Sequence, residues 1–201
     1  MNDVMRHYDL LVAEGNDPAR DPEELRAYMD GWDGETFLAQ LGLDGTQDAL
    51  EIGIGTGRLA LRTAPLCRSL TGVDLSPMTI ARARENLAGC GNVRLICADF
   101  LCWEAERRFD VVYSSLTLLH VADKRAAAER IASLLAPCGR AVLSLDKSRE
   151  TVLDYGTRKL AVYPDDPEEL ASHLRAAGLT VLPAQETAFA HILTAVKGEE
   201  R

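Results

Sequence analysis

Three glycines at alternate positions follow an apolar run in the segment A-L-E-I-G-I-G-T-G-R-L, residues 49–59. A glycine costs stability inside a strand or a helix, because its unfolded backbone has more conformations to lose. A chain that places three glycines together is therefore expected to turn tightly there, with a large polar group lying almost against its backbone. The apolar run before the turn predicts a strand, and the apolar run after it predicts a helix.

Short apolar runs alternate with segments of helical period from Asp48 to Leu145. This alternation is typical of successive βα units and of a parallel sheet. A strand at residues 179–182 and another at 189–196 are joined only by P-A-Q-E-T, which is too short for a crossover, so we expect this last pair to be antiparallel. The parallel strands are expected at residues 49–53, 70–74, 93–98, 109–114 and 140–145.

Local capping signals mark the helices. Ser76, Asp123 and Asp166 each precede a segment of helical period, and a proline follows both Ser76 and Asp166. Near the N-terminus, Asp21-Pro22 opens a helix, and a second short helix is expected around residues 37–41. We expect one domain over residues 1–201, in which a helical cap (1–46) precedes an α/β core that binds the cofactor (47–201). Residues 146–164 form a long connection, which we expect to be functional or partly structured.

Composition bounds the class of protein. The chain has 201 residues, 47% hydrophobic and 26% charged, which fits one globular domain with a sizeable core. Its formal net charge of −9 argues against a nucleic-acid partner, because phosphates attract a basic surface. Five cysteines without a C-x-x-C pair favour reduced thiols, and we expect no metal site. Neither a signal peptide nor an apolar stretch of roughly 20 residues is evident, so we expect a cytoplasmic protein that does not bind membranes.

Acidic residues end the next two expected strands. Asp74 stands 21 residues beyond Gly53, where a carboxylate can accept hydrogen bonds from both hydroxyls of a ribose. Asp99 ends the third strand, where it can accept a hydrogen bond from the exocyclic amine of an adenine. Ligands of open parallel sheets bind beyond the carboxyl ends of the strands, so the glycine turn and these acids predict a ligand that contains a nucleoside.

Glu51 distinguishes between two kinds of nucleoside ligand. It precedes the glycines in E-x-G-x-G-x-G, whereas a dinucleotide-binding strand is normally apolar there and continues as G-x-G-x-x-G. A carboxylate that faced a pyrophosphate would repel it, but a carboxylate that faced an ammonium group would attract it. A nicotinamide-dependent oxidoreductase of Rossmann type remains the alternative.

From residue 49 to residue 196 the sequence resembles the class I S-adenosylmethionine-dependent methyltransferases. The resemblance rests on L-E-I-G-I-G-T-G-R-L, G-V-D-L-S-P-M, C-A-D-F, F-D-V-V-Y-S-S-L-T-L-L-H and L-L-A-P-C-G-R, where the last departs mildly from the usual L-K-P-G-G turn. It implies an α/β, Rossmann-like three-layer αβα sandwich with a seven-stranded, mostly parallel sheet of order 3-2-1-4-5-7-6, strand 7 being antiparallel. It also implies S-adenosylmethionine as cofactor and S-adenosylhomocysteine as product.

The resemblance assigns roles to residues of this sequence. Glu51, Gly53 and Gly55 line the methionine part of the cofactor, Gly57 completes the turn, and Asp74 holds the ribose. The remaining cofactor-binding residues that it implies are Leu75, Met78, Asp99, Phe100 and Ser114, the last through its backbone carbonyl. The acceptor is a small molecule that the sequence does not identify.

No catalytic base is evident, because a sulfonium methyl group is already activated and positioning promotes its transfer. His120 is the candidate, although a histidine at a helix start explains it equally well. Substrate-side candidates are Tyr8, Tyr28, Trp32, His120, Tyr155 and Tyr163, although Tyr28 and Trp32 also have the helical spacing of core residues. The cations Lys147, Arg149, Arg158 and Lys159 hint at an anionic acceptor, or form a solvated loop face. A monomer or homodimer is expected, and a non-catalytic S-adenosylmethionine-binding protein is a further alternative.

Overall fold

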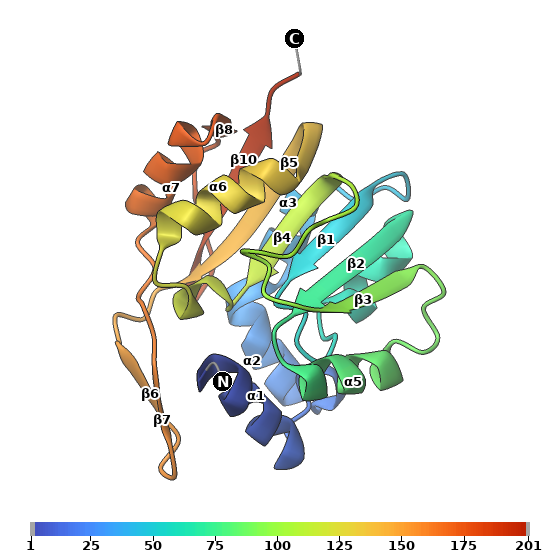
Figure 1. Ribbon diagram of the computed structural model, residues 1–201, viewed down its shortest axis with the longest axis vertical. Helices are drawn as coiled ribbons and strands as arrows, with labels where there is room; N and C mark the ends of the chain where they lie inside the picture. Colours follow the sequence, from blue (N-terminus) through green and yellow to red (C-terminus); the bar gives the residue numbers. More distant parts are fainter. Residues whose placement is uncertain (1–2, 200–201) are drawn as a thin grey trace.

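A mostly parallel sheet forms the centre of the computed structural model, which describes residues 3–199 (Figure 1). Its strands lie in the order β3-β2-β1-β4-β5-β10-β8, and β9 pairs with β10 off this path. Their bounds are β1 (Asp48–Ile52), β2 (Ser69–Asp74), β3 (Val93–Cys97), β4 (Phe109–Ser115), β5 (Leu135–Asp146), β8 (Leu179–Val181), β9 (Gln185–Glu186) and β10 (Ala190–Lys197).

The closing strands confirm the expected topology. β10 runs antiparallel to both β5 and β8, whereas β1 runs parallel to β2 and β4. With β8 and β10 as the sixth and seventh strands of the order 3-2-1-4-5-7-6, the expected sheet order is confirmed. The sequence did not predict β9, because its two residues lie within the short connection P-A-Q-E-T.

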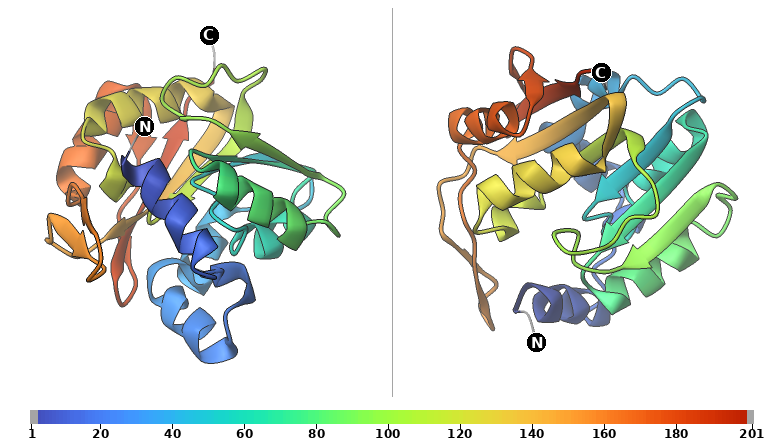
Figure 2. Two further views of the ribbon diagram at one scale, coloured as in Figure 1. Left: turned by 60° about the horizontal axis from the view of Figure 1, so that its bottom comes forward. Right: turned by 45° about the horizontal axis from the view of Figure 1, so that its top comes forward.

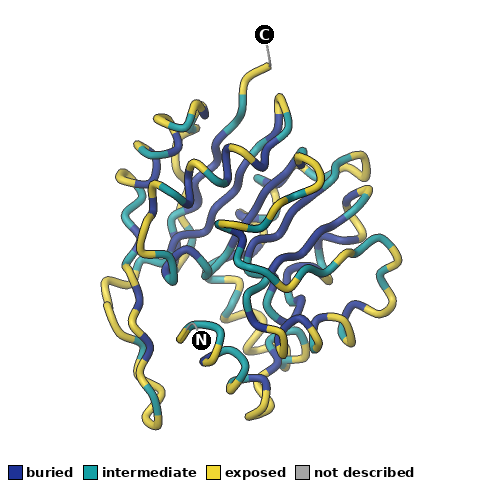
Figure 3. Tube along the Cα trace, in the orientation of Figure 1, coloured by how far each residue is buried: buried dark blue, intermediate teal, exposed yellow. Residues whose placement is uncertain are grey.

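Helices cover both faces of the sheet and complete a three-layer sandwich. α6 (Lys124–Leu134) and α7 (Pro167–Ala176) share one core cluster with Leu50 and Ile52 of β1. α3 (Glu35–Leu41), α4 (Ala60–Thr63) and α5 (Pro77–Asn86) share the other cluster with Ala49. Alternate residues of β1 therefore enter different cores, as the two-residue period of a strand requires, and the strands form the buried centre of Figure 3.

The expected caps are present. Ser76 accepts a hydrogen bond from the backbone N–H of Thr79 at 3.0 Å, and Asp123 accepts one from Ala126 at 2.8 Å. Asp166 accepts bonds from two backbone N–H groups in the first turn of α7. These bonds satisfy donors that the first turn of a helix leaves without a partner.

The N-terminal segment contributes α1 (Asp3–Ala13) and α2 (Glu23–Asp33) besides α3. The sequence predicted α2 and α3; α1 is an additional helix, and it packs beside α5 (Figure 2). Short 3-10 helices complete the chain: η1 (Pro18–Arg20), η2 (Ala64–Leu66) and η3 (Leu118–His120). The division into a cap and a core stays a prediction.

The long connection after β5 is partly structured. Within it, β6 (Val152–Asp154) and β7 (Lys159–Ala161) form a separate antiparallel pair, which extends from the sheet and lies next to α1 (Figure 2). Between residues 3 and 199, no helix combines the length and the apolar character that crossing a membrane requires.

Candidate functional site

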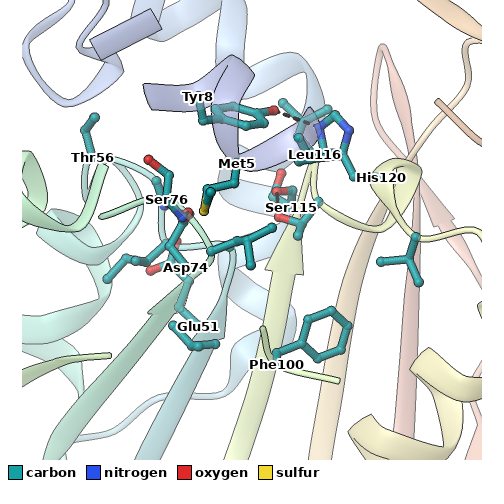
Figure 4. Close-up of a pocket in the computed structure, with 18 of the residues that line it drawn as sticks. Met5, Tyr8, Glu51, Thr56, Asp74, Ser76, Phe100, Ser115, Leu116 and His120 are labelled. Carbon is teal, nitrogen blue, oxygen red and sulfur yellow. Dashed lines mark hydrogen bonds between the residues drawn. The ribbon is translucent and has the colours of Figure 1, made fainter. Parts of the chain in front are cut away.

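A cavity of about 590 Å³ lies at the carboxyl ends of β1, β2 and β4 (Figure 4). Its walls come from α1, the glycine turn, the residues that follow β2, β3 and β4, and Tyr155 of the β6–β7 hairpin. The cavity therefore occupies the position where open parallel sheets bind ligands.

The glycine turn forms one wall of the cavity. Gly53 and Gly55 have φ angles of +73° and +58°, a region that residues with a side chain rarely adopt. A Cβ atom on Gly53 would collide with the side chain of Thr117, while a Cβ atom on Gly55 would meet nothing within 4 Å. Gly53 is thus required for packing and backbone conformation, and Gly55 leaves open space beside its backbone.

Asp74, at the end of β2, is held by two backbone donors. Its Oδ2 accepts from the N–H of Gly55 at 3.0 Å, and its Oδ1 accepts from the N–H of Ser76 at 2.9 Å. Burial raises the pKa of Asp74, and these hydrogen bonds oppose the rise. Because two carboxylate oxygens offer about four acceptor positions, Asp74 can still accept from a pair of hydroxyl groups.

Glu51 is the most deeply buried acid of the cavity wall, with 3% of its surface exposed. The hydroxyl of Tyr113 donates to its Oε2 at 2.9 Å. Burial raises the pKa of Glu51 to about 8, and the Tyr113 bond and the charge of Arg58 oppose this rise. A cation placed in the cavity would favour the ionised form of Glu51.

Asp99 and Phe100 follow β3 and line the same cavity together with Leu75. Asp99 accepts a hydrogen bond from the N–H of Leu101 at 3.0 Å, which fixes its carboxylate. The ring of Phe100 is buried in the core beneath the cavity. An acceptor and an apolar surface next to each other suit the edge and the face of an adenine.

The structure brings together most of the residues that the sequence indicated. Those that line the cavity are Tyr8, Glu51, Gly53, Gly55, Asp74, Leu75, Asp99, Phe100, His120 and Tyr155. Those outside its lining are Gly57, Met78, Ser114, Tyr28, Trp32 and Tyr163.

Three cofactor candidates outside the lining have other contacts. Gly57 lies close to Leu87, the side chain of Met78 is exposed, and the Ser114 hydroxyl donates to the carbonyl of Ile52. Ser115, the residue after Ser114, lines the cavity instead. β4 ends at Ser115, and the role of the Ser114 carbonyl stays a prediction.

The aromatic candidates also fall into two groups, inside and outside the cavity lining. Tyr28 and Trp32 pack against Phe189, and Tyr163 is exposed. Tyr8 and His120 face each other across the cavity wall, where the Tyr8 hydroxyl lies 2.7 Å from His120 Nε2 (Figure 4). Burial, together with the smaller effects of His7 and Lys124, lowers the pKa of His120 to about 4.

An ion pair that the sequence did not indicate supports the glycine turn. Arg58 directly follows that turn and donates to both oxygens of Asp33, which ends α2. The Ser115 hydroxyl donates to the same carboxylate at 2.6 Å. The position of Arg58 in the glycine motif was a signal, but nothing in the sequence indicates Asp33 as its partner.

A second contact joins α1 to the site. Asp9 accepts from the hydroxyl of Ser76 at 2.6 Å and from the N–H of Met78 at 3.2 Å. It therefore adds a carboxylate at the start of α5, where a negative charge is favourable. The cations of the long connection stay outside the lining, and each has an acidic neighbour: Lys147 with Glu186, Arg149 with Asp166, Arg158 with Glu14 and Lys159 with Asp154.

Comparison with known proteins matches residues 49–139 to a family described as a methyltransferase domain. Nodulation protein S of Sinorhizobium fredii is 30% identical over 145 residues, 69% of this chain and 65% of that protein. A trans-aconitate 2-methyltransferase of an Enterobacter species is 37% identical over 102 residues, 49% of this chain and 39% of that protein. The chain thus spans less than two thirds of the length of either relative.

The fold is also similar to that of a solved methyltransferase structure. The N-methyltransferase NodS from Bradyrhizobium japonicum, solved with S-adenosyl-L-homocysteine, superposes with a TM-score of 0.69. The two are 20% identical, and the match covers 90% of this chain and 95% of that one. Given the matched methyltransferase domain, these relatives and the shared sheet topology, this chain belongs to the class I S-adenosylmethionine-dependent methyltransferase family.

Proposed function

We propose that this protein binds S-adenosylmethionine, transfers its methyl group to a small-molecule acceptor and releases S-adenosylhomocysteine. One observation carries the proposal. Glu51, Asp74 and Asp99, from the ends of three neighbouring strands, line one cavity beside a glycine turn. Their order along the cavity matches the order of ammonium, ribose and adenine in the cofactor.

The residues present fit this cofactor. Asp74 would accept from the ribose hydroxyls while the N–H groups of Gly55 and Ser76 hold its carboxylate in place. Asp99 and the backbone of Phe100 would contact the edge of the adenine. Glu51 would face the ammonium group, whose charge compensates for the burial of the carboxylate.

When bound, S-adenosylmethionine supplies a methyl group that its sulfonium centre has already activated. The protein then has to position the acceptor and exclude water. α1 and the β6–β7 hairpin do this here, because Met5, Tyr8, Leu11 and Tyr155 close the side of the cavity away from the sheet. A tyrosine face directed at a cationic centre adds about 0.5–2 kcal/mol of attraction.

Several features support a small acceptor. The cavity wall is largely apolar, and the net charge of −9 disfavours nucleic acid. The name of the Enterobacter relative gives trans-aconitate, a small molecule, as the acceptor of that protein. We also propose a cytoplasmic location, and a monomer or a homodimer.

The rival functions predict different results. An oxidoreductase would place Glu51 beside a pyrophosphate, where two negative groups repel. A non-catalytic binding protein would keep the cavity without turnover. Incubating the protein with methyl-labelled S-adenosylmethionine and a protein-free extract of cells that carry its gene tests turnover. Labelled product supports the proposal, and a protein that binds S-adenosylhomocysteine but forms no labelled product contradicts it.

A further inference from the structure

A hydrogen bond connects the N-terminal helix to the segment that follows β4. The Tyr8 hydroxyl of α1 and the Nε2 of His120, at the end of η3, are 2.7 Å apart, and both side chains line the cavity (Figure 4). The two rings meet edge to face, with centroids 5.4 Å apart. This geometry allows a proton to pass between the two side chains.

Tyr8 is the side-chain hydrogen-bond partner that the structure shows for His120. The other ring nitrogen, Nδ1, is buried and has no hydrogen-bond partner in the described part of the chain. A base of the serine-hydrolase type holds that nitrogen with a carboxylate, whereas His120 does not. Its one hydrogen bond is therefore directed at Tyr8.

Burial and two titratable neighbours keep His120 neutral. Those that act on it are His7, on α1, and Lys124, in the first turn of α6. Lys124 is itself bound to Asp165 at 2.5 Å, and His7 accepts from Arg158 at 3.0 Å. With burial as the largest cause, the pKa of His120 falls to about 4, so at neutral pH the ring can accept a proton.

The described residues that line the cavity offer no free cation to an acceptor. Among the described lining residues, Arg58 is the only lysine or arginine, and both of its terminal nitrogens bind Asp33. The cations of the long connection lie outside the lining and beside acidic partners. An acceptor with a carboxylate or a phosphate at the reacting end would lose its hydration there without gaining a bond to a free lysine or arginine in exchange.

We propose that Tyr8 and His120 form a proton relay, and that the acceptor is an uncharged molecule that presents a hydroxyl group to Tyr8. This inference rests on the proposed methyl transfer. Tyr8 is the residue that touches the acceptor, and His120 takes up the proton behind it.

The step balances in atoms and charge. The acceptor oxygen bonds to the methyl carbon as the carbon–sulfur bond breaks, and sulfur keeps that electron pair. The acceptor's O–H bond breaks and its proton passes to the Tyr8 oxygen, while the Tyr8 proton passes to Nε2 of His120. One positive charge disappears at sulfur as another appears on the imidazole, so the net charge of the site does not change.

A hydroxyl acceptor needs a base such as the Tyr8–His120 pair to take its proton, whereas an amine acceptor does not. A hydroxyl oxygen becomes strongly acidic as it is methylated, so even a weak base can remove its proton. A methylated amine keeps its proton, with a pKa of about 10, as in lysine. It has no tendency to give that proton to His120, whose pKa is about 4.

The class of the methylated product tests the inference on the wild-type protein. The protein is incubated with methyl-labelled S-adenosylmethionine and the protein-free cell extract. The labelled products are extracted from acidified solution, which retains amines, and are then treated with alkali, which cleaves esters. A neutral, alkali-stable methyl ether is expected. An alkali-labile ester or an acid-soluble amine would overturn the inference while leaving methyl transfer intact, and the absence of any labelled product would contradict the proposed function itself.

Two conservative variants test the relay. Tyr8→Phe and His120→Gln are expected to lower kcat by about 100-fold or more, with little change in the affinity for S-adenosylhomocysteine. Imidazole added to His120→Gly should restore part of kcat. His191→Gln, a histidine of β10 outside the cavity lining, is the matched control and should keep full activity.

A measurement that does not require methyl transfer also tests the relay. In histidine-labelled protein without cofactor, nuclear magnetic resonance should show a neutral His120 near pH 6 whose Nε2 signal shifts in Tyr8→Phe. A His120 that titrates near its ordinary pKa and does not respond to Tyr8→Phe would overturn the relay. Full kcat in both conservative variants would overturn it as well.

Discussion

Arg58 donates hydrogen bonds to both carboxylate oxygens of Asp33, at 2.8 and 2.5 Å. Asp33 ends α2 and is fully buried, while Arg58 follows the glycine turn and lines the cavity. The pair therefore fixes the N-terminal helices to the part of the chain that would hold the methionine end of the cofactor. The shape of the site depends on a contact between two segments that lie apart in the sequence.

Breaking this pair should destabilise the fold. Asp33→Asn leaves the guanidinium of Arg58 largely buried without an opposite charge, which costs about 3–5 kcal/mol in comparable pairs. Denaturant unfolding measures the free energy. Glu35→Gln, which removes an exposed partner of Arg62, is the control and should change it by less than about 1 kcal/mol. A stability of Asp33→Asn equal to that of the wild type would show that the pair contributes little.

Asp74 is expected to contribute to cofactor affinity more than to folding. Asp74→Ala should weaken S-adenosylhomocysteine binding by roughly 1.5–3 kcal/mol, because charged hydrogen bonds to the ribose are lost. Isothermal titration calorimetry gives the affinity, and circular dichroism checks the fold. Asp44→Ala, an exposed turn residue outside the cavity lining, should bind like the wild type. An unchanged affinity of Asp74→Ala would mean that Asp74 has no contact with the ribose.

Glu51 should give the protein a stability that falls with rising pH. Its pKa is about 8 in the folded protein and 4.5 ordinarily, because burial disfavours the charge. At pH values between 4.5 and about 8, Glu51 holds a proton in the folded chain that it has lost in the unfolded chain. The free energy of unfolding should therefore decrease by up to about 1.4 kcal/mol per pH unit in that window. The stability that protonated Glu51 contributes is fully present only below pH 4.5.

The variant Glu51→Gln isolates this effect, since it removes the titrating group and keeps the size of the side chain. The difference in unfolding free energy between wild type and Glu51→Gln, measured in denaturant from pH 5 to pH 8, should shift steadily in favour of the variant. A difference that does not change with pH would contradict the raised pKa.

Leu116 has a φ angle of +54°, which is unusual for a residue with a bulky side chain. Because of this strain, we expect Leu116→Gly to be more stable than Leu116→Val. The difference in the free energy of unfolding should be about 1 kcal/mol or more. At Leu118, a buried residue of the 3-10 helix η3, we expect the reverse: Leu118→Val should be more stable than Leu118→Gly. Denaturant midpoints of the four variants provide the test, and the same order at both positions would show that the strain at Leu116 is negligible.

Local signals explain how much of the fold could be predicted. Ser76 and Asp123 cap helices with their own side chains, so the sequence around them is sufficient to mark where those helices begin. The short connection before β10 fixes an antiparallel pairing by its length. The acids at the strand ends were found because strand ends of a parallel sheet meet at one edge.

The missed features depend on contacts that no local signal carries. The Tyr8–His120 bond joins residues 112 positions apart, and its strength depends on how α1 packs over the cavity. Asp33 looks like any acid at a helix end until Arg58 reaches it. Ser115 lines the cavity because β4 ends there, and the exact end of a strand is difficult to predict from sequence.

Calorimetric titration of the wild-type protein with S-adenosylhomocysteine, and separately with NAD, tests the central claim most directly. The three carboxylates and the glycine turn predict one site per chain with micromolar affinity for S-adenosylhomocysteine and no binding of NAD. Binding of NAD without binding of S-adenosylhomocysteine would contradict the account, because the cavity would then accept a pyrophosphate beside Glu51.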